Sequence, residues 1–204
     1  MARYIAVEGP IGVGKTALAT FVAEKLGARS VLEPTPNPFL DFDGRNAFPA
    51  SIYSLLQRFQ NKDALHQEDL FSNGLVADHL FACDRIAAQA NLSRDELMLY
   101  DKVYGLLGAQ VPRPDLVVYL QARPDVLQQR LKRRGGRVPA REYIENMASA
   151  YAEFFFHYGD GPLLVVNTSE IDFVQNRPEA EDLVAVIQRT KAGVSHYSPL
   201  GSRQ

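Results

Sequence analysis

The residues best suited to chemistry in this sequence stand close together near its start. Gly9, Gly12 and Gly14 are followed at once by Lys15 and Thr16. Glycines let the backbone curl at positive φ, so that several amide N–H groups can point at one anion. A lysine beside such a loop reaches the β- and γ-phosphates of a nucleotide, and a threonine hydroxyl can ligate magnesium. The spacing Gly-x-x-x-x-Gly-Lys-Thr therefore predicts a phosphate loop that holds ATP and Mg²⁺.

The segments on either side of the glycines support this interpretation. Residues 4–7 have the pattern of a buried strand, and apolar residues from Leu18 to Leu26 form one stripe on a helix. The N-terminus of that helix adds partial positive charge to the loop. A plain glycine turn between a strand and a helix is the alternative. The expected nucleotide-binding residues are Gly9, Pro10, Ile11, Gly12, Val13, Gly14, Lys15 and Thr16.

Three acids follow apolar segments that read as strands. Glu8 follows the first of them, Glu33 follows residues 30–32, and Asp78 follows residues 75–77. Ligands of parallel sheets bind at the carboxyl ends of the strands, so these acids are expected to converge on one edge. A carboxylate within hydrogen-bond reach of a substrate hydroxyl can assist its attack on a γ-phosphate.

Short apolar segments alternate with longer amphipathic segments along the whole chain. Further strands are expected at 115–120 and 163–166, and helices around 48–59, 144–158 and 183–187. Ser93 and Glu96 have capping-box spacing, and Pro124 suits the first turn of a helix. This order predicts an α/β fold in which helices cover both faces of a parallel sheet of about five strands. One domain is expected over residues 1–191, and the loss of periodicity over 192–204 is typical of a poorly ordered tail.

Composition narrows the class of protein. The chain has 204 residues, and 46% of them are hydrophobic, which allows a sizeable core. The net charge of −2 argues against binding to nucleic acid or to a membrane surface. We find no secretory signal and no run of the ~18 apolar residues that a membrane span needs, so a cytoplasmic protein is expected. The one cysteine, Cys83, is interpreted as a buried structural thiol.

Several longer segments resemble the deoxynucleoside kinase family, above all bacterial enzymes that act on deoxyadenosine and deoxyguanosine. These segments are IAVEGPIGVGKT, VLEPTPNPFL, LLQRFQ, PDLVVYLQARPDVLQQRLKRRG and AYAEFFFHYGDGPLLVVNTSEIDFV. The likeness extends from Tyr4 to about Leu183. It implies a P-loop kinase that transfers the γ-phosphate of ATP to the 5′-hydroxyl of a purine deoxynucleoside, in nucleotide salvage. It also implies a homodimer, for which Phe48, Ile52 and Phe59 are candidate contact residues.

The resemblance assigns roles to four residues on the nucleoside side. Glu33 matches the carboxylate that takes the proton from the 5′-hydroxyl. Asp78 matches an acid that orients magnesium or its waters. Asp84 and Arg58 match a pair that recognises the base by hydrogen bonding. A salt bridge between Asp84 and Arg58 that only ties two helices together is the alternative for that pair.

The resemblance also implies an arginine-rich lid over about residues 130–142. Arg130, Arg134 and Arg137 lie at a helix end and just beyond it. Mobile guanidinium groups there would neutralise the charge that phosphoryl transfer spreads over the γ-oxygens. Arg130 and Arg134 are expected to act in catalysis and Arg137 to bind the nucleotide. A solvated basic helix face is the alternative.

Several positions depart from the family pattern, most of them on the nucleoside side. Ser51 stands where relatives usually carry a glutamine that reads the base, and His79 where many carry an arginine. The loop over residues 40–45 is shorter than in relatives and lacks their sugar-binding tyrosine, a space that Phe42 fills in part. Glu142 substitutes for acids that usually follow the last lid arginine. A kinase of another small hydroxyl substrate and a non-catalytic nucleotide-binding subunit are therefore alternative functions.

Overall fold

A parallel β-sheet forms the centre of the protein. The structure is a computed structural model that describes residues 3–33, 37–39, 45–66, 73–135, 137–171, 173 and 176–197. Within these ranges six strands form one sheet in the order β2-β3-β1-β4-β5-β6, and all neighbouring pairs are parallel. The strands are β1 (Arg3–Glu8), β2 (Arg29–Val31), β3 (Gly74–Ala77), β4 (Leu116–Gln121), β5 (Leu163–Asn167) and β6 (Val194–Tyr197).

Strand β1 lies in the middle of the sheet because both of its faces are apolar. Ile5 and Val7 belong to one buried cluster, whereas Tyr4 and Ala6 belong to another on the opposite face. Successive side chains of a strand point to opposite faces, so an uninterrupted apolar run requires cover on both sides. Its C-terminal residue, Glu8, is therefore carried to the middle of the sheet edge.

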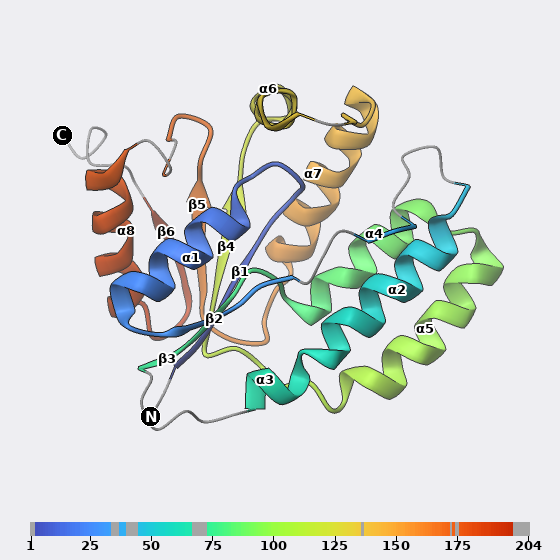
Figure 1. The fold of residues 1–204 in the computed structure, drawn as a ribbon, viewed down its shortest axis with the longest axis horizontal. Helices are drawn as coiled ribbons and strands as arrows, with labels where there is room; N and C mark the ends of the chain where they lie inside the picture. Colours follow the sequence, from blue (N-terminus) through green and yellow to red (C-terminus); the bar gives the residue numbers. More distant parts are fainter. Residues whose placement is uncertain are drawn as a thin grey trace.

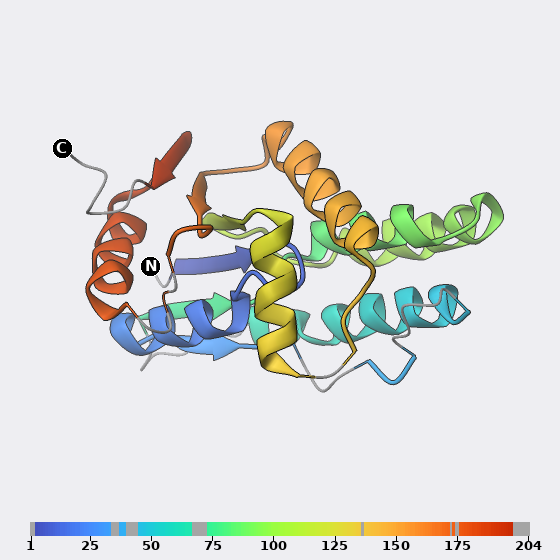
Figure 2. The ribbon, with the colours of Figure 1, turned by 90° about the horizontal axis from the view of Figure 1, so that it is seen from above.

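Helices supply that cover, and a third group of helices extends beyond the sheet (Figures 1 and 2). Helices α1, α6 and α8 pack on one face, and α4 and α7 pack on the other. Helices α2, α4 and α5 share a separate apolar cluster and lie to the right in Figure 1. The helices are α1 (Lys15–Leu26), α2 (Ala47–Gln60), α3 (Lys62–His66), α4 (Asp84–Asn91), α5 (Arg94–Gly108), α6 (Pro124–Arg134), α7 (Arg141–Phe156) and α8 (Arg177–Arg189), with a 3₁₀ turn, η1, at Phe81–Cys83.

Most expected elements are confirmed within one or a few residues. Ser93 and Glu96 form the predicted capping box of α5, and Pro124 is the first residue of α6. Cys83 is buried, and burial raises the pKa of its thiol well above the usual value, as expected of a structural cysteine. None of the helices in the described ranges has both the length and the apolar character needed to cross a bilayer. The cytoplasmic location stays a prediction.

One expectation is corrected. The sheet has a sixth strand, β6, in the segment that was expected to be a poorly ordered tail. It was missed because a four-residue edge strand with only one buried side chain, Tyr197, leaves no apolar pattern. Phe48, Ile52 and Phe59, the candidate dimer contacts, are partly buried and pack against the cluster shared by α2, α4 and α5, and their role as subunit contacts stays a prediction.

Candidate active site

The predicted phosphate loop connects β1 to α1 at the carboxyl edge of the sheet. Gly9 has φ +152°, and a Cβ atom there would lie 2.2 Å from the carbonyl oxygen of Leu120. Gly14, with φ +105°, precedes the first residue of α1 and provides no side-chain cap. The first N–H groups of a helix have no partners within the helix, so here they remain available to an anion.

Lys15 is folded back over its own loop. Its ammonium donates a hydrogen bond to the carbonyl oxygen of Gly9 at 2.8 Å and lies 3.8 Å from Oε1 of Glu8. The backbone N–H groups of Gly9 and Leu80 each donate to one oxygen of Glu8, both at 2.8 Å. Glu8 is fully buried. Its place at the strand end was predicted, but no role was assigned to it, because its partners are distant in sequence.

Asp78 joins the phosphate loop to the end of β2. The Thr16 hydroxyl donates to its Oδ2 at 2.6 Å, and the backbone N–H of Glu33 donates to its Oδ1 at 2.6 Å. Burial raises the pKa of the Asp78 carboxyl, but hydrogen bonds, first from His79 and then from Thr16, outweigh burial and leave the pKa below its usual value. Asp78 therefore stays a carboxylate beside the loop.

The same two side chains fit a magnesium ion. The Thr16 hydroxyl and the Asp78 carboxylate are hard oxygen donors of the kind Mg²⁺ prefers, and their oxygens lie 2.6 Å apart. In the part of the chain that the structure describes, no group of three or more His, Cys, Asp or Glu could hold a metal. A magnesium ion at Thr16 and Asp78 would thus need phosphate oxygens and water as its other ligands.

Arg58 of α2 contacts three carboxylates at once. Its Nη2 and Nε donate to Oε1 of Glu33 at 2.6 and 2.8 Å. Its Nε also lies 3.4 Å from Oδ1 of Asp84, and its Nη1 lies 3.9 Å from Oε2 of Glu8. The salt bridge considered for Asp84 and Arg58 is thus present between α2 and α4. The same guanidinium also holds Glu33, so the pair lies beside the proposed base as well as between the two helices.

This cluster perturbs the protonation of its acids. Partial desolvation raises the pKa of Glu33, but the Arg58 guanidinium, followed by the Lys15 ammonium, outweighs it, so the net pKa is lowered. Glu33 is therefore unprotonated near neutral pH. Burial raises the pKa of Asp84, which also accepts a hydrogen bond from the Tyr100 hydroxyl at 2.7 Å.

The structure describes only some of the remaining residues that were predicted for the nucleoside side of the site. Ser51 lies on α2 seven positions before Arg58, which places both residues on one face of the helix. Phe42 and most of the shortened loop lie outside the described residues. His79 is buried, and its Nδ1 lies 3.5 Å from Oδ1 of Asp78.

The predicted lid arginines have different surroundings in the structure. The Arg130 guanidinium donates to the hydroxyl of Thr168 at 2.9 Å and to the carbonyl oxygens of Thr168 and Ile171 at 2.7 and 2.9 Å. These contacts tie α6 to the connection after β5. Nη1 of Arg130 also lies 3.4 Å from the carbonyl oxygen of Val13 in the phosphate loop, and the expected role of Arg130 at the phosphates stays a prediction. Arg134, the last residue of α6, and Arg137 are exposed. Glu142 is also exposed, in the first turn of α7.

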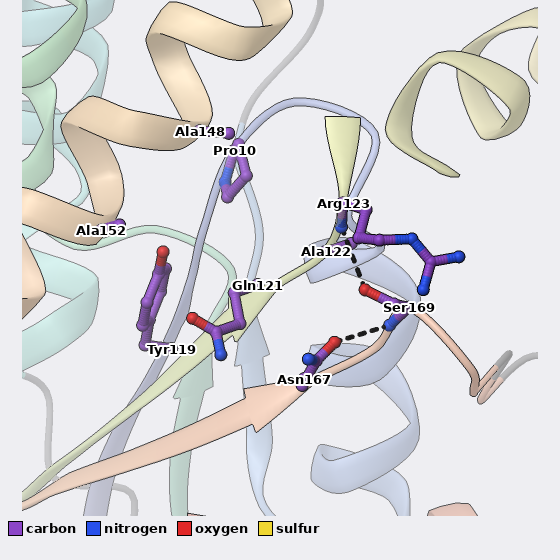
Figure 3. A pocket seen from close by; sticks show the side chains of 9 residues that line it. All are labelled: Pro10, Tyr119, Gln121, Ala122, Arg123, Ala148, Ala152, Asn167 and Ser169. Carbon is purple, nitrogen blue, oxygen red and sulfur yellow. Dashed lines mark hydrogen bonds between the residues drawn. The ribbon is translucent and has the colours of Figure 1, made fainter. Parts of the chain in front are cut away.

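A pocket of about 210 Å³ includes Pro10 of the phosphate loop in its lining (Figure 3). It is bounded by α7 and by the carboxyl ends of β4 and β5. Of the predicted site residues, it includes only Pro10. Its other lining side chains include Tyr119, Gln121, Ala148, Ala152 and Asn167. The pocket is therefore separate from the cluster of Glu33, Arg58 and Asp84.

Comparisons with known proteins agree on one family. A model described as deoxynucleoside kinase matches residues 5–191. Deoxyguanosine kinase of Bacillus subtilis is 29% identical over 92% of this chain and 97% of its own length. Deoxyadenosine/deoxycytidine kinase of the same species is 27% identical over 88% of this chain and 89% of its own length. The solved structure of deoxyadenosine kinase from M. mycoides with bound dATP has a TM-score of 0.75 at 23% identity and covers 91% of this chain and 99% of that one.

Proposed function

This chain belongs to the deoxynucleoside kinase family, and from that premise we propose that it transfers the γ-phosphate of ATP to the 5′-hydroxyl of a purine deoxynucleoside. The observation that carries the proposal is the pair of 2.6 Å hydrogen bonds on Asp78, from the Thr16 hydroxyl and from the Glu33 backbone. They hold a proton acceptor beside the loop that would receive the triphosphate. Phosphoryl transfer is mostly a matter of such positioning and of charge stabilisation.

Each part of the site has a defined role in this proposal. The loop amides and Lys15 bind the β- and γ-phosphates. Glu33 accepts the proton of the attacking 5′-hydroxyl, for which its unprotonated state at neutral pH is suited. Thr16 and Asp78 hold magnesium, which supplies positive charge to the phosphates when bound. Arg134 and Arg137 neutralise charge on the γ-oxygens when the lid closes.

The choice of a purine rests on the relatives and on the Arg58–Asp84 pair. The Bacillus relative with the higher of the two identities reported above is named a deoxyguanosine kinase. Arg58 presents several donors and Asp84 an acceptor, only 3.4 Å apart, which suits the mixed donor and acceptor edge of a purine. Ser51 is too short for the bidentate contact of a glutamine at that position.

Turnover of Glu33→Gln tests the proposal. We expect kcat to fall by about 10²- to 10⁴-fold, the usual contribution of a general base, while the affinity for ATP is retained. ADP release is measured with each natural deoxynucleoside, and ATP affinity by calorimetry. Glu24→Gln, on the exposed face of α1, is the matched control. Full activity of Glu33→Gln would reject the base assignment.

The wild-type protein in the same assay separates the alternative functions. Phosphorylation of deoxyadenosine or deoxyguanosine supports the proposed activity. ADP release only with a different hydroxyl compound would identify another substrate class. ATP binding without any transfer would identify a non-catalytic subunit.

We also propose that the protein is a homodimer. Met98, Leu99 and Leu106 leave large apolar side chains exposed on α5, the helix on the outer side of the helical cluster in Figure 1. Exposed apolar surface of this kind is common where subunits meet. Sedimentation equilibrium is expected to give twice the monomer mass for the wild type and the monomer mass for Leu106→Glu.

A further inference from the structure

Glu8 is a fully buried acid for which the proposed reaction has no direct use. Its side chain is held in place by the backbone N–H groups of Gly9 and Leu80, each at 2.8 Å. The Tyr151 hydroxyl of α7 lies 3.5 Å from the same oxygen that Gly9 contacts. Glu8 is thus fixed among three segments, and its charge must be balanced by nearby cations because a buried, unpaired carboxylate is costly.

Two cations balance Glu8, and they come from opposite halves of the site. The Lys15 ammonium lies 3.8 Å from Oε1, on the side of the phosphate loop. The Arg58 guanidinium lies 3.9 Å from Oε2, on the side of the predicted nucleoside site. Neither contact is a close hydrogen bond, and each cation is held by a backbone carbonyl instead: Lys15 by Gly9 at 2.8 Å, and Nη1 of Arg58 by Leu80 at 3.3 Å.

Each cation also has a second partner that a substrate would replace or release. The closest partner of Lys15 is the uncharged carbonyl oxygen of Gly9, and phosphate oxygens would attract its ammonium more strongly than this carbonyl does. Arg58 donates twice to Oε1 of Glu33, one of the two carboxylate oxygens that could accept the proton of the nucleoside hydroxyl. At this oxygen the arginine competes with the second substrate for the proposed base.

We propose that Glu8 is a positioning residue that couples the binding of ATP to the binding of the nucleoside. When phosphates draw Lys15 away, Glu8 retains only Arg58 and attracts it more strongly. This weakens the hold of Arg58 on Glu33, so that the Glu33 carboxylate becomes available to the 5′-hydroxyl. The coupling is reciprocal, because each substrate must raise the affinity for the other by the same factor. This inference rests on the proposed function.

Calorimetric titration of a deoxynucleoside, with and without a non-hydrolysable ATP analogue, tests the coupling. The wild type is expected to bind the nucleoside at least about 5-fold more tightly when the analogue is present, within the usual range of coupling between sites. Glu8→Gln has nearly the same shape but no charge, and its two affinities are expected to be equal. Glu24→Gln, the exposed control on α1, should keep the wild-type factor. Equal coupling in Glu8→Gln and the wild type would overturn the inference.

A second variant keeps the inference testable if Glu8→Gln does not fold. Lys15→Met removes the ammonium that ATP would otherwise displace. Its nucleoside affinity without ATP is expected to equal that of the wild type with the analogue. Lys25→Met, at the surface ion pair with Glu181 at the other end of α1, should behave as the wild type. Unchanged nucleoside affinity in Lys15→Met would also overturn the inference.

Failure of the inference is distinguishable from failure of the proposed function. A wild type that neither binds nor phosphorylates any deoxynucleoside would reject both. A wild type that phosphorylates a deoxynucleoside, but whose coupling does not depend on Glu8, would reject only the role given to Glu8.

Discussion

At the scale of single residues, Glu33, the proposed base, is paired with the Arg58 guanidinium. Glu33 is 42% exposed, yet Arg58 contacts it by two nitrogens. The guanidinium keeps the carboxylate ionised but also occupies one of its oxygens. Because the pKa of Glu33 is lower in the folded protein than its ordinary value, this carboxylate contributes stability at neutral pH that is lost as the pH falls through the folded value.

The pH dependence of turnover should report this pair. Arg58→Met removes the second-largest influence on the pKa of Glu33 and leaves desolvation, which raises it. The acidic limb of kcat/KM is therefore expected to move to higher pH than in the wild type. The profile is measured between about pH 4 and 8, around the reference pKa of glutamate. Arg85→Met, which breaks a pair with Asp101 instead, should leave the limb in place.

At the scale of elements, the turn from β1 into α1 depends on one close approach of backbone to backbone. A Cβ on Gly9 would lie 2.2 Å from the Leu120 carbonyl oxygen of β4. This neighbour is main chain in a central strand, so it cannot move aside as a flexible side chain would. Glycine is therefore favoured at position 9 for two reasons: the backbone conformation of the loop and the close approach of β4.

Gly9→Ala is therefore expected to lower both stability and ATP affinity. We expect a loss of about 2 kcal/mol or more in the free energy of unfolding, from strain at this φ and the clash with β4. Urea unfolding and ATP titration measure the two effects. Gly105→Ala, in α5 where a Cβ meets no atom within 4 Å, is the control and should be neutral or stabilising. Unchanged unfolding of Gly9→Ala would show that the strands can separate there at little cost.

Two arginines of helix α6 have different surroundings, and we predict different roles for them. Arg130 is tied to carbonyl oxygens of the connection after β5, whereas Arg134 is exposed at the helix end. Arg130→Lys is expected to lower the free energy of unfolding by about 2 kcal/mol, since a lysine cannot make the same fork of charged hydrogen bonds. Arg134→Lys should lower kcat without lowering the melting temperature. The opposite pattern in calorimetry and kinetics would mean that the two roles are exchanged.

At the scale of the whole molecule, β6 is the edge strand beside β5, and its Tyr197 side chain contacts α8. The Tyr197 ring is buried in the cluster under α1 and α8, and its hydroxyl lies 2.8 Å from a Glu179 carboxylate oxygen and 3.0 Å from one of Asp182. The C-terminal segment thus joins the core although its own sequence carries little apolar pattern.

Shortening the chain after Lys191 tests the contribution of β6. We expect the free energy of unfolding to fall by about 3 kcal/mol or more, comparable to the loss of one large buried aromatic side chain. His196→Ala, on the exposed side of the same strand, should change it little. Urea unfolding of the three proteins gives the comparison, and equal midpoints for the shortened and full-length chains would contradict the assignment.

The sequence by itself determined the features that depend on local spacing. The phosphate loop, the alternation of strands and helices, the capping box of α5 and the strand-end positions of Glu33 and Asp78 all follow from residues within one or two turns of each other. Hydrophobic periodicity and glycine conformation act over this short range, so they can be read without tertiary contacts.

Only the tertiary structure decided which charged groups, distant in the sequence, interact with one another. Glu8, Lys15 and Arg58 form one network because the fold brings Arg58 of α2 to the end of β1. Arg130 of α6 donates hydrogen bonds to the chain that follows β5 because the two segments lie side by side. The short β6 likewise forms by pairing with β5 and by burying Tyr197 in the core, neither of which its local sequence pattern shows. Electrostatic and packing energies depend on distance in space, and that distance is set by the fold and not by the separation along the chain.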